Sequence, residues 1–213
     1  MNWFVRICMS SIGKKFLMAL TGLVFCSFVA MHLGGNLSIF LGKSYFTSYA
    51  EHLHNLGILI NFAEWALLGC AIIHIIMGTV LFVENVRARP VRYVLKKNAG
   101  GRTWTSALMP YTGLYLLLFI LVHLFTFHFI EHSPQTTFKI LADKFSSEGY
   151  VVFYIFSVIV VAFHVKHGLW SAFQTLGANH PKYMSIIKVL SLLFAVSIGL
   201  GFGSIPLFML AVT

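Results

Sequence analysis

Charged residues are scarce in this 213-residue chain, and acidic residues are the scarcest of them. Asp and Glu number 6, Lys and Arg 15, and together they make up 10% of the sequence. Soluble globular domains carry roughly 25% charged residues, so this composition excludes a soluble globular domain. With 58% apolar residues and a mean hydropathy of +0.85, the chain is predicted to be a polytopic membrane protein. In a membrane protein, the positions of the basic residues behind its net charge of +9 indicate which loops are cytoplasmic. No nucleic-acid partner is expected.

Cysteines and linker-like segments are also few. The three cysteines, Cys8, Cys26 and Cys70, have no C-x-x-C spacing, which argues against a disulfide framework or a cysteine metal site. No Ser/Pro-rich or low-complexity tract divides the chain, so one domain over residues 1–213 is predicted. The first apolar run exceeds the roughly 7 to 15 residues of a signal-peptide core and is interpreted as an uncleaved span.

Five uncharged or nearly uncharged runs are long enough to cross a bilayer, which needs about 20 apolar residues. Backbone amides in lipid can be satisfied within a helix but not in an open strand, so an all-α fold with five transmembrane helices is predicted. The runs are Phe16–Leu41, Gly57–Val83, Thr105–Ile130, Gly149–Phe173 and Val189–Thr213.

The basic residues indicate the orientation of these spans. If the amino terminus is cytoplasmic, twelve of the fifteen Lys and Arg lie on the cytoplasmic side, and only Lys43, Lys139 and Lys144 lie outside. The positive-inside rule favours this orientation. The basic loop from Arg87 to Arg102 is then cytoplasmic, where it could attract anionic lipid headgroups or dock a soluble partner.

Four histidines belong to an internal repeat. Runs one and three each contain T-G-L, with a histidine eleven residues after the threonine, and runs two and four each contain H-x-x-x-G. Equivalent histidines are 91 residues apart in the first pattern and 90 in the second. This indicates a parallel two-helix repeat with a fifth helix added. The histidines are His32 and His123 in the first pattern, and His74 and His164 in the second.

These histidines are predicted to pair at two depths. Counted from Phe16 and Ala107 as the inner ends of the first and third spans, His32 and His123 each lie sixteen residues in. Counted from Glu84 and Gln174 as the inner ends of the second and fourth, His74 and His164 each lie ten residues in. Two imidazoles facing each other across diagonal helices are the axial ligands of a six-coordinate haem. Zinc takes three or four protein ligands, and no acidic residue lies at these depths for a proton relay. A four-helix bundle holding two haems is therefore predicted, with electron transfer as its role.

Other interpretations remain open from the residues alone. A lone histidine within a span can simply bond a neighbouring helix, and a haem-free transporter or structural anchor would use it so. Gly78 and Gly168, one turn after the inner histidines, could let a flat macrocycle approach or serve close helix packing.

The chain resembles the di-haem cytochrome b (b558-type) membrane anchor subunit of succinate dehydrogenase and fumarate reductase. The resemblance rests on the two T-G-L runs, on M-H-L-G-G-N at 31–36 and on F-H-V-K-H-G-L-W-S at 163–171. It implies His32 and His123 as ligands of the outer haem, and His74 and His164, rather than His167, as ligands of the inner haem. Both would be haem b.

The resemblance also implies function and partners. The family anchors an iron-sulfur subunit and a flavoprotein subunit on the cytoplasmic face of the bacterial inner membrane, and passes electrons between them and a quinone, here expected to be menaquinone. Complexes of this kind could pair as dimers. The anchor of another quinone-linked dehydrogenase, such as a hydrogenase or formate dehydrogenase, is the alternative, although those face a partner outside.

The quinone site is expected near the outer haem. Glu51, His52 and His54 are candidates there, with a solvated loop as the alternative. Some relatives carry a glutamate on the fourth helix for a proton path, but this chain has Ala162 at that position. Glu64 could substitute for it or simply reach the membrane surface.

Overall fold

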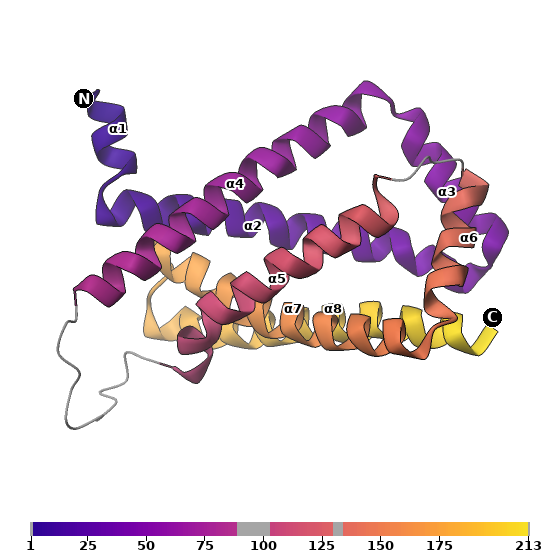
Figure 1. Ribbon diagram of the computed structural model, residues 1–213. Coiled ribbons are helices and arrows are strands. Elements are labelled where there is room, and N and C mark those ends of the chain that lie inside the picture. The colour runs from indigo at the N-terminus through magenta and orange to yellow at the C-terminus, as the bar shows by residue number, and fades with distance from the viewer. Residues whose placement is uncertain (1, 89–102, 130–133, 213) are drawn as a thin grey trace.

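The computed structural model describes residues 2–88, 103–129 and 134–212, and every regular element within these ranges is a helix. Five helices are long and apolar enough to cross a membrane, which confirms the predicted all-α fold with five spans. In Figure 1 they run between the two ends of the molecule. They are α2 (Ser11–Asn36, followed by the 3-10 helix η1, Leu37–Leu41), α4 (Ile58–Arg87), α5 (Trp104–Phe127), α7 (Glu148–Thr175) and α8 (Pro181–Val212).

Several helices begin at residues suited to start them. Ser10 precedes α2, and its hydroxyl accepts the backbone N–H of Gly13 at 3.0 Å. Thr103 precedes α5 and forms a reciprocal capping box with Ser106. Helix α8 starts at Pro181 rather than at the expected Val189. Proline is favoured in the first turn, and the polar residues that follow it continue the helix beyond the apolar run.

Three shorter helices lie outside the long ones: α1 (Trp3–Cys8), α3 (Lys43–Asn55) and α6 (Pro134–Phe145). Helices α3 and α6 pack against each other at the end of the molecule opposite α1 (Figure 1). We call the α3/α6 end the outer end and the opposite end the inner end, following the orientation that the basic residues predict.

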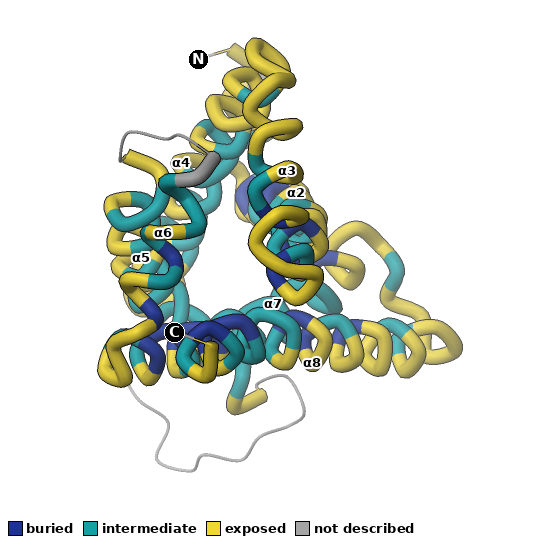
Figure 2. The backbone as a smooth tube through the Cα atoms, turned by 90° about the vertical axis from the view of Figure 1, so that its right-hand side faces the viewer, coloured by how far each residue is buried: buried dark blue, intermediate teal, exposed yellow. Residues whose placement is uncertain are grey.

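The long helices have a definite neighbour order. Helix α2 packs against α4 and α7, while α5 packs against α7 and contacts α4. Consequently α2 and α5 lie on one diagonal of the four helices, and α4 and α7 on the other. Helix α8 packs along α7 and also contacts α2. Figure 2 shows α7 and α8 lying together along one side of this arrangement.

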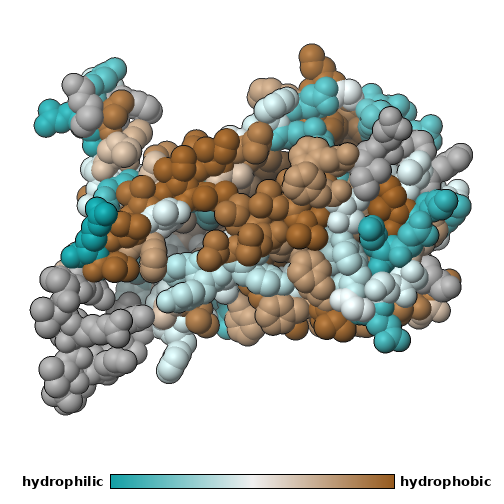
Figure 3. Space-filling view, in the orientation of Figure 1, coloured by the Kyte–Doolittle hydropathy of each residue, from teal (hydrophilic) through white to brown (hydrophobic). Residues whose placement is uncertain are grey.

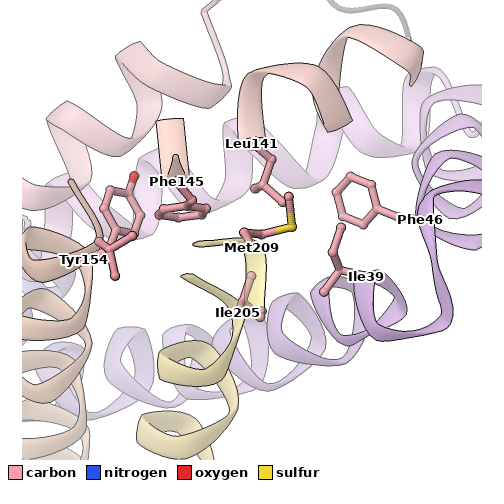
Figure 4. Packing of buried hydrophobic residues seen from close by; sticks show 8 residues of the cluster. Ile39, Phe46, Leu141, Phe145, Tyr154, Ile205 and Met209 are labelled. Carbon is pink, nitrogen blue, oxygen red and sulfur yellow. The ribbon is translucent and has the colours of Figure 1, made fainter. Parts of the chain in front are cut away.

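The best-packed region is at the outer end. Leu141 and Phe145 of α6 are directed toward the fully buried Met209 of α8, and Ile39 and Phe46 approach from the opposite side (Figure 4). Tyr154 of α7 borders the same cluster. Helices α3 and α6 therefore form a packed cap over the outer ends of the spans.

Helices α4 and α5 are packed differently, because neither contains a buried residue among those described. Figure 3 shows apolar side chains covering the face that these two helices present, with hydrophilic side chains gathered toward the ends of the molecule. An apolar surface of this extent is typical of contact with lipid.

The inner end carries the described part of the predicted basic side. Lys14 near the start of α2 forms an ion pair with Glu84 in the last turn of α4. Arg87 is exposed at the end of α4. The rest of the expected docking loop, residues 89–102, lies outside the described residues, and the cytoplasmic position of the amino terminus stays a prediction.

Candidate functional site

His32 of α2 and His123 of α5 lie together on diagonal helices and are called the outer pair. Their ring centroids are 5.9 Å apart, and the ring planes are perpendicular at 90°. Phe28 stacks on His32 with a centroid distance of 5.3 Å, and Phe119 lies 5.9 Å from His123. Each phenylalanine lies one turn before its histidine, so the internal repeat extends to them. Phe202 of α8 adds a third ring, 5.6 Å from His32.

The separation within the outer pair suits two imidazoles that hold one metal from opposite sides. Metal–imidazole bonds of about 2 Å on each side, with the radius of each ring added, place two such centroids about 6 Å apart. A bis-histidine haem needs these two protein ligands and apolar surroundings. Within the described ranges, no group of three or more His, Cys, Asp or Glu could hold a metal ion. Two imidazoles from diagonal helices, with phenylalanine rings around them, fit haem iron.

His74 of α4 and His164 of α7, called the inner pair, are each held by a threonine of a neighbouring helix. Thr21 Oγ1 of α2 lies 2.9 Å from His74 Nδ1, and Thr112 Oγ1 of α5 lies 3.0 Å from His164 Nδ1. These threonines begin the two T-G-L runs, so the repeat places the same contact twice. On α2 and α5 they are eleven residues, or about 16 Å of helix, inward from the outer pair.

The glycine after each threonine brings the neighbouring helix close to the imidazole. A Cβ at Gly22 would lie 3.5 Å from Cε1 of the adjacent inner histidine, and one at Gly113 would lie 3.6 Å from its counterpart. At the glycines singled out from the sequence, a Cβ on Gly78 would meet Met18 Cε at 3.5 Å, whereas one on Gly168 would meet no protein atom within 4 Å. The glycines that border the histidines are thus those of T-G-L.

The outer pair has different ring partners. His123 Nδ1 lies 3.2 Å from the Tyr154 hydroxyl. His32 Nδ1 lies 3.4 Å from the Asn36 side-chain nitrogen, which also donates to the His32 carbonyl at 2.8 Å. The outer pair is therefore tied to α7 and to its own helix, whereas both inner histidines are tied to T-G-L threonines.

His167 lies one turn inward from His164 and belongs to another environment. Its Nδ1 is 3.1 Å from Thr105 Oγ1, and its ring meets Trp170 edge-on with centroids 4.9 Å apart. It also lines an inner cavity of about 380 Å³, together with Lys188 of α8. His167 thus lies at the inner end of the bundle and belongs to neither histidine pair.

An outer cavity of about 430 Å³ lies where α3 joins α4, beside α5. Its lining includes His54, Asn61 and Glu64, with His128 from the end of α5. The Glu64 carboxylate lies 3.8 Å from His128 Nδ1. Among the three quinone-site candidates predicted from the sequence, only His54 lines this cavity.

Glu51 and His52 are exposed on α3 and are absent from the lining. The sequence did not single out Glu64 and His128 as a pair, because they lie 64 residues apart in the chain. Both lie toward the predicted outer ends of their spans, and this position is the feature of the sequence from which their proximity could have been predicted.

Comparison with known proteins identifies a relative. Over 114 residues, the chain is 28% identical to the succinate dehydrogenase cytochrome b558 subunit of Bacillus subtilis (strain 168), and the alignment covers 51% of this chain and 56% of that protein. The chain thus spans little more than half the length of this curated relative. No family model matches the chain, and no solved structure matches it. The similarity confirms the resemblance to a b558-type anchor, and with the five apolar helices it identifies a multi-pass bacterial inner-membrane protein.

Proposed function

We propose that this chain is the membrane anchor and electron-transfer subunit of a succinate:quinone or quinol:fumarate oxidoreductase, and that it binds two b haems. The observation that carries the proposal is the pair formed by His32 and His123 on diagonal helices, with ring centroids 5.9 Å apart. The repeated Thr–His contacts of the inner pair and the similarity to a cytochrome b558 subunit support it.

Each histidine pair would hold one haem iron through its two imidazoles. Haem b bound in this way carries one electron and has no open coordination site for substrate. The outer pair would hold the outer haem, and Phe28, Phe119 and Phe202 would keep water from it. The inner pair would hold the inner haem, with its rings oriented by Thr21 and Thr112.

The outer cavity supports a quinone site beside the outer pair. Quinol oxidation releases two electrons and two protons, so the head group needs hydrogen-bonding partners and a base. Glu64 and His128, 3.8 Å apart, supply a carboxylate and an imidazole, while Asn61 and His54 supply further polar groups. Glu64 and His128 would take up the protons at the outer end, and the outer histidine pair would hold a one-electron carrier nearby. Menaquinone remains the expected quinone on family grounds.

The soluble partners would dock at the inner end. An iron-sulfur subunit and a flavoprotein subunit would carry the dicarboxylate chemistry, so this chain needs no catalytic acid or base for it. The basic sequence from Arg87 to Arg102 offers positive charge to such a partner, and steering by complementary charge speeds association.

A spectroscopic experiment tests the proposal. The full chain is purified in detergent after expression in haem-replete cells, and haem is measured by the pyridine haemochrome assay and by the reduced-minus-oxidised spectrum. We expect two haems b per chain. Protein without haem would overturn the proposal in favour of a transporter or structural anchor.

A further inference from the structure

We propose that Thr21 and Thr112 are positioning residues that set the tautomer of the inner histidines, and thereby the midpoint potential of the inner haem. This inference rests on the proposed function, because it assigns a role toward a haem that the inner pair would hold. Neither threonine would touch iron; each would act through the histidine of the adjacent helix.

The hydrogen bonds of the two hydroxyls determine the direction of the contact. Thr21 Oγ1 donates to the Leu17 carbonyl at 2.7 Å, and Thr112 Oγ1 donates within its own helix to carbonyls at 3.1 Å. A threonine hydroxyl has a single hydrogen, so its oxygen is left to accept at the imidazole. The Nδ1–H of each inner histidine is therefore the donor.

This direction leaves Nε2 of His74 and His164 with a lone pair. A metal-binding histidine coordinates through one unprotonated nitrogen and usually donates its other N–H to a neighbouring acceptor, which sets the ring orientation and strengthens the ligand. The threonine oxygens are acceptors of this kind. Thr21 is 6% exposed, so water competes little for its bond.

The contact distinguishes the inner pair from the outer pair. Both inner rings meet a threonine that immediately precedes a glycine, and a Cβ on that glycine would lie only 3.5–3.6 Å from Cε1 of the imidazole. The outer rings instead face the Tyr154 hydroxyl and the Asn36 amide. Changes at the threonines should therefore alter one haem and leave the other unchanged.

The sign of the effect follows from the donor direction. An imidazole that donates from Nδ1 gives more electron density to iron and so favours the oxidised haem. Replacing threonine by valine keeps the side-chain shape but removes the acceptor. The midpoint potential of the inner haem should then rise by on the order of 59 mV, which for one electron corresponds to a tenfold increase in the ratio of reduced to oxidised haem at a fixed potential.

The experiment compares Thr21→Val and Thr112→Val with Thr21→Ser and Thr112→Ser in the full chain. Redox titration followed at the haem absorption bands gives both midpoint potentials, and low-temperature EPR of the oxidised protein reports the ligand field of each haem. We expect the valine variants to shift the inner haem only, and the serine variants to match the wild type. Thr79→Val is the matched control, because the Thr79 hydroxyl donates to a carbonyl of α4 and the Thr79 side chain is exposed.

The outcomes separate this inference from the function on which it rests. A wild-type chain without haem refutes the proposed function. Two haems in the wild type, with unchanged potentials in both valine variants, refute the threonine role alone. The role is also refuted if serine shifts the potential as much as valine, if both haems shift equally, or if both valine variants lose both haems.

Discussion

The Tyr154 hydroxyl lies 3.2 Å from Nδ1 of His123 and joins the outer histidine pair to the packed cap at the outer end. Tyr154 of α7 is itself buried, in the hydrophobic cluster on which that cap packs. The same side chain thus belongs to the best-packed region and to the candidate haem site, so its ring and its hydroxyl can be tested separately.

Tyr154→Phe should keep the packing and remove the hydrogen bond. We expect a loss of about 1 kcal/mol of stability, typical of one hydrogen bond, and a shift in the midpoint potential of the outer haem with the inner haem unchanged. Redox titration and thermal loss of haem absorbance measure the two effects. Tyr115→Phe, which removes a hydroxyl bonded to Ser157, is the control, and an equal shift in it would contradict the assignment.

Removing one histidine of a pair should remove one haem. His32→Ala or His123→Ala should lower the haem content from two to one per chain and abolish the outer haem signal, because a bis-histidine site loses half of its protein ligands. His74→Ala or His164→Ala should have the reverse effect. The pyridine haemochrome assay gives the stoichiometry, and EPR identifies the haem that remains.

His167→Ala is the matched control for His164→Ala. His167 bonds Thr105 at the inner end, so its loss should leave both haems in place. Retention of two haems in His164→Ala, with loss of one in His167→Ala, would show that the ligand is the other histidine of the motif.

Glu64→Gln should impair quinone turnover without changing haem content. Loss of a general base typically lowers the rate by about 10²-fold or more, whereas the histidine pairs are untouched. The assay is quinol oxidation or quinone reduction by the assembled complex, with the haem spectrum recorded on the same preparation. Glu51→Gln, on the exposed face of α3, should retain full activity. Equal losses in both variants would exclude the outer cavity as the quinone site.

The Lys14–Glu84 ion pair joins α2 to α4, and replacing Glu84 should cost more stability than replacing Lys14. The Lys14 side chain is 7% exposed and that of Glu84 is 48% exposed. Glu84→Gln therefore leaves a buried ammonium unpaired, at a cost of about 1–3 kcal/mol. Lys14→Met leaves a carboxylate that can reach water and should cost less.

Thermal loss of haem absorbance in detergent gives the order of stability, and the double variant completes the cycle. The double variant should be more stable than Glu84→Gln alone, because no buried charge remains. If Lys14→Met were the least stable of the three, the burial of Lys14 would not be the cause.

The spans could be predicted because each is a long apolar run, and counting these runs gives the number of spans. Their ends were less predictable: α8 begins at Pro181 rather than Val189, since polar residues near a membrane surface can remain helical. Helices α3 and α6 were missed because 13 and 12 residues of mixed polarity lack an apolar run. They pack on each other, α3 also packs on η1, and α6 also packs on α7 and α8.

Some features of the candidate site could likewise be predicted from the sequence, and others depend on how the helices pack. The repeat brings His32 and His123 to one level from spacing alone, without knowledge of any contact. The Thr21–His74 bond needs the rotation of α2 against α4, which spacing does not specify. Glu64 and His128 likewise meet only because α4 and α5 converge at the outer end, and so the sequence pointed to the nearby Glu51 and His52 instead.

The absence of buried residues from α4 and α5 has a consequence for the order in which the helices assemble. Helices α2, α7 and α8 pack on one another and form a platform held by protein contacts alone. Helix α4 packs on α2, and α5 packs on α7, but α4 and α5 touch each other little. Haems bound among the four helices, as proposed, would therefore add cohesion between α4 and α5. Maturation would then be sequential: the platform would form first, and α4 and α5 would settle against each other only once the proposed haems were bound between them.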